Sequence, residues 1–286
     1  MGEINTVGIV GSGIMGSGLA EVAARSGYDV VVRSRSKTGA EGVLGAVTAN
    51  LDRQVDKGKL EAADRDAIVG RITATHQLAH LADCDLVIES VVEDLPTKRE
   101  LFCELDQIVK PEGILATNTS TLPVIELAME TGRPDKVCGI HFFNPAPMMS
   151  LVEIVRPLTA SDETIAEARA FAEACGKNPV EVKDQAGFIV NALLFPYLNN
   201  AVRMLENGTA SAGDIDAAMQ GGCNFPMGPL ALLDLVGLDT SLAILEALYA
   251  EFRDPNYAPV PLLRRMVSAG QLGRKSGSGF YEYARK

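Results

Sequence analysis

The sequence predicts an α/β domain built on a doubly wound sheet with a projecting helical hairpin, followed by an all-α domain. A short apolar strand, Thr6 to Val10, runs directly into a glycine-rich turn and a helix. Short apolar strands then alternate with helical segments up to residue 183, a pattern typical of a parallel sheet covered by helices. Beyond that point almost every segment has helical periodicity.

The glycine-rich turn has the form Gly-x-Gly-x-x-Gly. A strand, this turn and a helix in that order are typical of a dinucleotide-binding Rossmann domain. Gly11 would allow the tight turn, Gly13 would let a pyrophosphate approach the backbone, and Gly16 would let the helix pack closely on the strand. The helix begins at Met15, directly after Ile14, and its N-terminus would face the negative charge. We therefore predict that a dinucleotide binds here.

The second strand begins at Asp29 and ends in a basic loop. NAD enzymes carry an acidic residue about 20 positions after the glycines, which binds the ribose hydroxyls. Here the strand runs into Arg33, Ser34 and Arg35 instead. A carboxylate would repel a 2′-phosphate, whereas Ser34 and its flanking arginines could bind one through charge-assisted hydrogen bonds. We predict a preference for NADP, with NAD still possible; the alternative is a solvated basic loop.

The segment from residue 40 to residue 70 is helical and longer than an ordinary crossover, so we expect it to project as a hairpin. Arg53 and Lys57 are four residues apart and share a helix face. They form a candidate patch for a phosphate-rich ligand, with an ordinary solvated face as the alternative. His76 and His80 have the same spacing, but without a third ligand we interpret them as surface residues and predict no metal site.

Polar residues follow or end the later strands between residues 86 and 142. Because the carboxyl ends of parallel strands line the ligand crevice of an open sheet, we expect Glu93, Asn118, Ser120 and His141 to face one cleft. The serine and threonine residues near position 120 could instead cap the helix that begins near Pro123.

His141 lies at the end of an apolar strand that stops before Asn144-Pro145. Taken alone it is a core histidine with satisfied nitrogens. The next apolar run, Leu151 to Val155, has Glu153 at its centre, and a lone carboxylate among apolar residues is costly to bury without a partner. A His141–Glu153 pair would fix the tautomer of the imidazole and make it a better base.

Composition limits the partners and the location. The net charge of −11 argues against nucleic acid or an anionic membrane as a partner. No apolar run approaches the roughly 18 residues that cross a membrane, and a strand close to the N-terminus leaves no room for a signal peptide. The five cysteines have neither metal nor redox spacing, so we expect buried free thiols and a cytoplasmic location.

We place the domain boundary at Asp184–Gly187, between a dinucleotide-binding domain (1–183) and a helical domain for substrate binding and dimerisation (184–286). The long apolar helix from Phe188 to Asn207 would suit a homodimer interface. The chain ends in a basic, glycine-rich loop from Gly273 to Tyr281.

The sequence resembles the short-chain L-3-hydroxyacyl-CoA dehydrogenases nearly from end to end, and most closely their bacterial 3-hydroxybutyryl-CoA branch. The stretches that carry the resemblance are Gly11–Gly16, Val87–Glu89, Asn118–Ser120, His141–Pro145, Val152–Glu153, Gly187–Asn191, Pro226–Pro229 and Gly273–Gly277. The His-Phe-Phe-Asn-Pro stretch with its downstream glutamate is hard to meet by chance.

The resemblance implies reversible hydride transfer between a nicotinamide cofactor and a 3-hydroxyacyl-CoA, with acetoacetyl-CoA as the ketone. His141 would take the hydroxyl proton, Glu153 would orient His141, and Ser120 and Asn191 would hydrogen-bond the C3 oxygen or the thioester carbonyl. The residues implied to border the cofactor are Glu93, Lys98, Asn118, Ser120, Asn144 and Lys275. Arg53 and Lys57 match the positions by which the hairpin of this family holds the CoA phosphates.

Two other interpretations stay open. A related dehydrogenase could act on a free 3-hydroxy acid or sugar acid; Arg53 and Lys57 favour CoA over this. A catalytically silent nucleotide-sensing protein could share the fold; the intact His141–Glu153 pair argues against it. Many members of the family also carry an aspartate where this chain has Ser34, and this departure favours NADP over NAD. The length of the acyl chain and the physiological direction stay open, with four carbons favoured.

Overall fold

The structure is a computed structural model that describes residues 4–284. It divides into two compact units, one ending at Asp184 and the other beginning at Gln185. No helix in the described range is both long enough and apolar enough to cross a bilayer.

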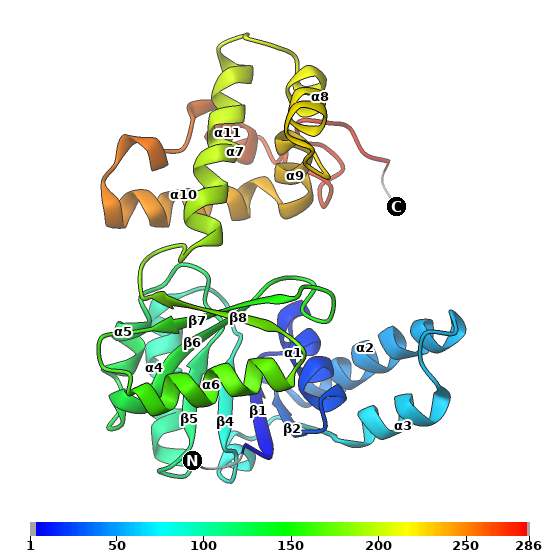
Figure 1. Ribbon diagram of the computed structural model, residues 1–286, viewed down its shortest axis with the longest axis vertical. Coiled ribbons are helices and arrows are strands. Elements are labelled where there is room, and N and C mark those ends of the chain that lie inside the picture. Colours follow the sequence, from blue (N-terminus) through cyan, green and yellow to red (C-terminus); the bar gives the residue numbers. More distant parts are fainter. Residues whose placement is uncertain (1–3, 285–286) are drawn as a thin grey trace. The chain divides into compact units, whose positions relative to one another are not determined.

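One sheet of eight strands organises the first unit, in the order β3-β2-β1-β4-β5-β6-β7-β8 (Figure 1). Its strands from β1 to β6 run parallel, β7 runs antiparallel to β6, and β8 runs parallel to β7. This mostly parallel, helix-covered sheet confirms the predicted Rossmann-type fold. The strands are β1 Thr6–Val10, β2 Asp29–Arg33, β3 Ile72–Thr75, β4 Leu86–Glu89, β5 Ile114–Thr117, β6 Val137–Phe142, β7 Leu151–Arg156 and β8 Asn178–Lys183.

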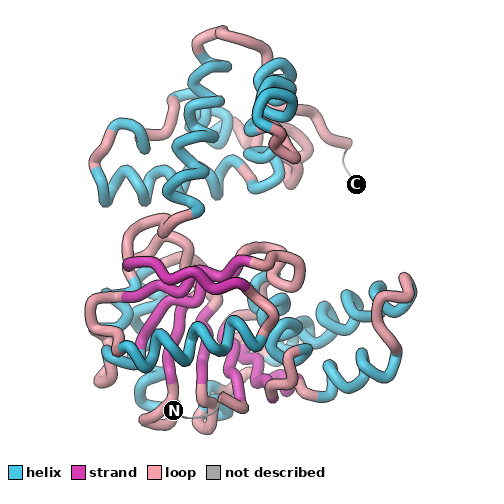
Figure 2. Tube along the Cα trace, in the orientation of Figure 1, coloured by secondary structure: helices cyan, strands magenta, loops and turns pink. Residues whose placement is uncertain are grey.

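Helices cover the sheet (Figure 2). A single apolar cluster joins strand residues such as Ile9 and Ile88 to side chains of α1, α2 and α6. Helix α4 contacts β5 and helix α5 contacts β6, and neither contributes a described residue to that cluster. The helices of this unit are α1 Ile14–Arg25, α2 Lys37–Asp56, α3 Ala62–Gly70, α4 Leu95–Ile108, α5 Val124–Ala128 and α6 Asp162–Ala174, with short 3₁₀ turns η1 Leu78–Leu81 and η2 Pro134–Lys136.

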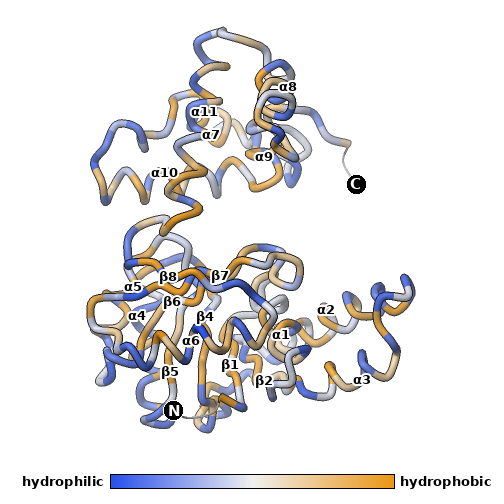
Figure 3. Tube along the Cα trace, in the orientation of Figure 1, coloured by the Kyte–Doolittle hydropathy of each residue, from blue (hydrophilic) through white to orange (hydrophobic). Residues whose placement is uncertain are grey.

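The predicted hairpin is present: α2 and α3 lie side by side and extend away from the sheet (Figure 1). Ser36 caps α2, with its side chain accepting a hydrogen bond from the Gly39 amide. Val43, Val47 and Leu51 bury one face of α2 in the core. The far end of the hairpin is hydrophilic (Figure 3), so its tip is open to solvent and to charged ligands.

The second unit is helical, as predicted. Its core gathers apolar residues from all of its long helices, among them Phe195, Leu233 and Leu245. Its helices are α7 Val190–Glu206, α8 Ala212–Cys223, α9 Pro229–Val236, α10 Leu238–Phe252 and α11 Pro261–Ser268, with a 3₁₀ turn η3 Pro255–Tyr257.

The glycine-rich tail of this unit is wrapped around one buried carboxylate. Asp234 of α9 accepts hydrogen bonds at 3.0 Å from the amides of Phe280 and Tyr281 and from the Tyr283 hydroxyl. A side chain at Gly279 would collide with the Asp234 carboxylate, its Cβ lying 2.0 Å from Oδ1. The glycines are therefore required where the tail closes over Asp234.

The glycine turn yields a stability prediction. A Cβ at Gly16 would lie 2.1 Å from the carbonyl oxygen of Gly11, whereas a Cβ at Gly13 would meet nothing within 4 Å. Although alanine is the better helix former, we expect Gly16→Ala to lower the free energy of unfolding by about 1–3 kcal/mol through overpacking. Gly13→Ala is the matched control, and it should lower this free energy by less, because its methyl group meets no atom within 4 Å and only the N-cap preference for glycine is lost. Urea denaturation of both variants measures this, and equal stabilities would contradict it.

Candidate active site

The end of β6 extends past its neighbour β5. Pairing between them stops where Gly139 lies opposite Thr117, whereas β6 stays paired with β7 on its other edge up to Phe142. The Phe142 amide therefore has no strand partner on the β5 side. The side chain of Asn118 takes that place, and its Oδ1 accepts the Phe142 N–H at 2.8 Å.

His141 lies in this extension, directly opposite Glu153 of β7. Side chains of opposed residues in an antiparallel pair point to the same face, and here Nδ1 of His141 lies 2.8 Å from Oε2 of Glu153. Both side chains are almost fully buried. A buried carboxylate opposite an imidazole accepts its N–H, so the proton lies on Nδ1 and Nε2 is left with its lone pair.

Ser120 lies on the Nε2 side of the imidazole. Its Oγ is 3.0 Å from Nε2, and with the proton on Nδ1 the hydroxyl donates this hydrogen bond. The Phe143 ring packs at 4.6 Å from the imidazole. The imidazole is thus fixed on three sides, with its basic nitrogen beside a hydroxyl, and a substrate hydroxyl placed there would meet the same lone pair.

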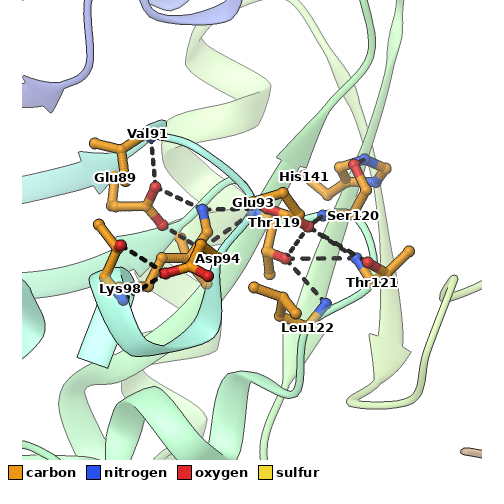
Figure 4. Close-up of polar contacts among 12 residues, drawn as sticks. Glu89, Val91, Glu93, Asp94, Lys98, Thr119, Ser120, Thr121, Leu122 and His141 are labelled. Carbon is orange, nitrogen blue, oxygen red and sulfur yellow. Dashed lines mark hydrogen bonds and ion pairs between the residues drawn. The ribbon is translucent and has the colours of Figure 1, made fainter. Parts of the chain in front are cut away.

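The turn that carries Ser120 is held by Glu93 (Figure 4). Oε1 of Glu93 accepts hydrogen bonds from the Thr119 hydroxyl at 2.5 Å and from the Ser120 amide at 2.9 Å. Burial alone would raise the pKa of Glu93, but the charge of Lys98 and the hydrogen bonds from Thr119, Ser120 and Lys98 hold that pKa below its usual range. Glu93 is therefore ionised near neutral pH and acts as an acceptor.

Lys98 is enclosed by two carboxylates. Its Nζ lies 2.6 Å from Oε1 of Glu89 and 3.2 Å from Oε2 of Glu93. Glu89, at the end of β4, also accepts hydrogen bonds from the Thr117 hydroxyl and from the Val91 amide. Sequence reasoning missed Glu89 and Thr119. The signal for Glu89 was available, because it is a lone carboxylate in an apolar strand, as Glu153 is.

The glycine turn has the geometry that a dinucleotide requires. Gly11 has φ +136°, and a Cβ there would lie 2.1 Å from the carbonyl oxygen of Ser90. The open space beside Gly13 leaves its backbone accessible to a ligand. Within the described chain, no side chain caps α1 and no acidic residue lies in its first turn, which includes Ile14 and Met15. Its N–H groups face outward as an anion site, which fits a pyrophosphate.

At the end of β2, the three residues predicted to bind a 2′-phosphate differ in their exposure. Ser34 is buried, and its hydroxyl donates a 2.9 Å hydrogen bond to Ser12 of the glycine turn. Arg35 is exposed. Arg33 is half-buried, and its Nε has no hydrogen-bond partner among the described residues. Burial lowers the pKa of the Arg33 guanidinium. The negative charge of Glu104 raises that pKa, and the positive charge of Arg35 lowers it further. The two arginines are thus the groups at this strand end that an anion would stabilise.

On the hairpin, Arg53 and Lys57 are both exposed. The Arg53 guanidinium donates to Oδ1 of Asn50 at 3.1 Å, and the Asn50 amide donates to Glu21 of α1 at 2.7 Å. Glu21 is buried, so Arg53 is connected through Asn50 to the core. Lys57 caps the C-terminus of α2.

Three further predicted residues lie on other segments of the chain. Asn144 is exposed just after β6. In the second unit, Asn191 lies in the first turn of α7, and Lys275 of the tail is paired with Asp239 at 2.5 Å.

In the described range no group of three or more His, Cys, Asp or Glu could hold a metal ion. The expectation of five buried thiols is wrong for Cys103 and Cys223, which are exposed on α4 and α8.

Comparisons with known proteins identify the family of the chain. Residues 6–185 match the family model described as 3-hydroxyacyl-CoA dehydrogenase, NAD binding domain, and residues 187–283 match that of the C-terminal domain of the same enzymes. The chain therefore belongs to the 3-hydroxyacyl-CoA dehydrogenase family. A 3-hydroxybutyryl-CoA dehydrogenase of Mycobacterium tuberculosis is 48% identical over 282 residues, which cover 98% of this chain and 99% of the relative.

Solved structures of family members share the whole fold. The crystal structure of FadB2 from M. tuberculosis has a TM-score of 0.97 at 47% identity and covers 99% of this chain and 100% of its own. That of the (S)-3-hydroxybutyryl-CoA dehydrogenase PaaH1 from Ralstonia eutropha has a TM-score of 0.96 at 44% identity, with the same coverage. Both of these proteins therefore share the fold of this chain.

The position of the imidazole proton is testable without any ligand. We expect Nδ1 of His141 to be protonated and Nε2 to be the acceptor, because Glu153 accepts from Nδ1. Glu153→Gln can present an amide N–H to Nδ1 and so move the proton to Nε2. Nitrogen NMR at neutral pH distinguishes the two tautomers, and only three histidines contribute. The same tautomer in both proteins would contradict this assignment.

Proposed function

We propose that the chain is a 3-hydroxybutyryl-CoA dehydrogenase that interconverts (S)-3-hydroxybutyryl-CoA and acetoacetyl-CoA with NADP(H). The observation that carries the proposal is the buried His141–Glu153 pair, with Nε2 of the imidazole beside the Ser120 hydroxyl at the end of β6. The relative from M. tuberculosis and the PaaH1 structure carry this enzyme name. The four-carbon substrate is taken from those names.

In the oxidation direction, Nε2 of His141 takes the proton of the substrate hydroxyl. Glu153 stabilises the imidazolium that forms, because its carboxylate faces Nδ1 at 2.8 Å. Ser120 places the C3 oxygen through its hydroxyl, and Asn191 does so for the C3 oxygen or the thioester carbonyl. A bound nicotinamide cofactor would supply the hydride acceptor for C3. In reduction the protonated His141 returns the proton to the C3 oxygen.

Gly11, Gly13 and Gly16 with the N-terminus of α1 would hold the cofactor pyrophosphate, and Arg33 and Arg35 its 2′-phosphate. A phosphate dianion between two guanidinium groups would make charge-assisted hydrogen bonds, and it would offset the burial and repulsion that act on Arg33. Ser34 would contribute indirectly, because its hydroxyl is held by Ser12. The other proposed cofactor contacts are Ile14, Met15, Glu93, Lys98, Asn118, Ser120, Asn144 and Lys275.

The proposal includes a homodimer in the cytoplasm, formed through the second unit. Leu193 and Met204 are 72% and 45% exposed on α7, and their spacing puts them on one helix face. Apolar side chains of this size on one face are typical of subunit interfaces. The proposal also assigns cofactor binding to residues 1–183, and substrate binding and dimerisation to residues 184–286.

The first test compares initial rates of acetoacetyl-CoA reduction with NADPH and with NADH. We expect a higher kcat/KM with NADPH, and we expect Arg33→Ala and Arg35→Ala to reduce that preference by about tenfold each, since a charge-assisted hydrogen bond contributes about 1.5–3 kcal/mol. His141→Ala should abolish turnover while the fold is kept. An NADH preference would overturn the cofactor assignment alone, and no turnover with either cofactor would overturn the proposed function.

The hairpin patch is tested through the KM for acetoacetyl-CoA. We expect Arg53→Ala with Lys57→Ala to raise this KM roughly tenfold without changing kcat, because the two cations act on phosphates far from the reacting carbon. A truncated acetoacetyl thioester without the nucleotide part of CoA is the matched control. Its KM should be the same for wild type and variant. An unchanged KM for acetoacetyl-CoA would make the patch an ordinary solvated face.

A further inference from the structure

One buried carboxylate next to the active site, that of Glu89, has no role in the mechanism above. Glu89 is 0% exposed and Lys98 is 1% exposed, so their ion pair is closed off from solvent. Taking two charges out of water is costly unless both are well hydrogen-bonded, and a buried pair is by itself poor evidence of a stabilising role. Its position at the end of β4, in the row of strand ends that carries the active site, calls for another explanation.

The pair is connected to His141 by an unbroken series of contacts (Figure 4). Glu89 holds the Lys98 ammonium at 2.6 Å, and Lys98 holds Oε2 of Glu93 at 3.2 Å. The other oxygen of Glu93 holds the Thr119 hydroxyl and the Ser120 amide. The Ser120 hydroxyl then lies 3.0 Å from Nε2 of His141.

The two carboxylate oxygens of Glu93 contact different groups. Oε2 faces Lys98, while Oε1 faces the turn at residues 119–121. The Glu93 side chain is 40% exposed, so nothing but these contacts keeps it from turning into solvent. Lys98 in turn is fixed by Glu89, whose Oε2 is bonded to the Thr117 hydroxyl and whose Oε1 is bonded to the Val91 amide.

We propose that Glu89 is a positioning residue that, through Lys98 and Glu93, sets the place of the Ser120 hydroxyl against the basic nitrogen of His141. Glu89 is fully buried, so a ligand cannot reach its carboxylate and it can act only through its neighbours. A displacement of about 1 Å in a positioning group can lower a rate by roughly 100-fold. This inference rests on the proposed dehydrogenase function.

The test is a double-mutant cycle between Glu89→Gln and Ser120→Ala in the full-length chain, with acetoacetyl-CoA as substrate. Glutamine keeps the shape of residue 89 and removes the charge that fixes Lys98. We expect Glu89→Gln to lower kcat by roughly 10- to 100-fold and to leave KM within about twofold. In the Ser120→Ala background it should have no further effect on kcat, because the hydroxyl that it positions is gone.

Two kinetic outcomes overturn the proposal. One is an equal fall in kcat in both backgrounds, which a merely structural role would give. The other is a folded Glu89→Gln enzyme with a kcat within about twofold of wild type. If Glu89→Gln does not fold, Glu93→Gln replaces it in the same cycle, because a partly exposed side chain tolerates the change. Lys98→Arg should restore most of the kcat lost in Lys98→Met.

The matched control is Arg99→Met, the neighbour of Lys98 on α4. Arg99 is paired with Glu130 at the surface, so its loss should leave kcat unchanged. Nitrogen NMR of the His141 imidazole separates this inference from the proposed function, since it needs no turnover. A wild-type chain inactive on acetoacetyl-CoA would overturn the function, whereas a His141 Nε2 signal unmoved by Glu89→Gln would overturn the positioning role of Glu89.

Discussion

The hydrogen bond between His141 and Glu153 depends on one feature of the sheet, the reversal of direction between β6 and β7. In a purely parallel sheet a strand end meets other strand ends, and a buried carboxylate from the middle of a strand cannot reach them. Antiparallel pairing places the centre of β7 opposite the end of β6. It also keeps β6 in the sheet beyond the point where its pairing with β5 stops, so strand pairing holds the imidazole at the end of β6.

Asn118 and Glu93 supply hydrogen-bond partners for backbone groups that have no neighbouring strand at this edge. Backbone groups that leave a sheet inside a protein need other partners. Asn118 supplies one for Phe142, and Glu93 supplies one for the turn that carries Ser120. The same side chains that replace the missing strand therefore also fix the polar groups around His141. The same hydrogen bonds stabilise the strand ends and set the geometry of the site.

The fold class could be predicted from the sequence, because hydrophobic periodicity, glycine spacing and the polar residues at strand ends all follow from local interactions. Strand β3, Ile72–Thr75, was missed because alternate threonines hide a short strand after a long helix. The cost of burying a lone carboxylate predicts a partner for Glu153, and it applies equally to Glu89, the last residue of β4. The inward turn of Ser34 was beyond sequence reasoning, since it depends on the approach of Ser12 from another loop.

The charge distribution explains how an acidic chain can bind anionic ligands. A net charge of −11 gives no long-range attraction for phosphates, and screening confines each interaction to roughly 8–10 Å. Binding must therefore come from cations fixed at the point of contact. Arg53 is fixed in this way through Asn50 and Glu21, and Arg33 through partial burial at the end of β2. Guanidinium groups suit this role better than ammonium groups, because their planar donors match two phosphate oxygens at once and select by geometry as well as by charge.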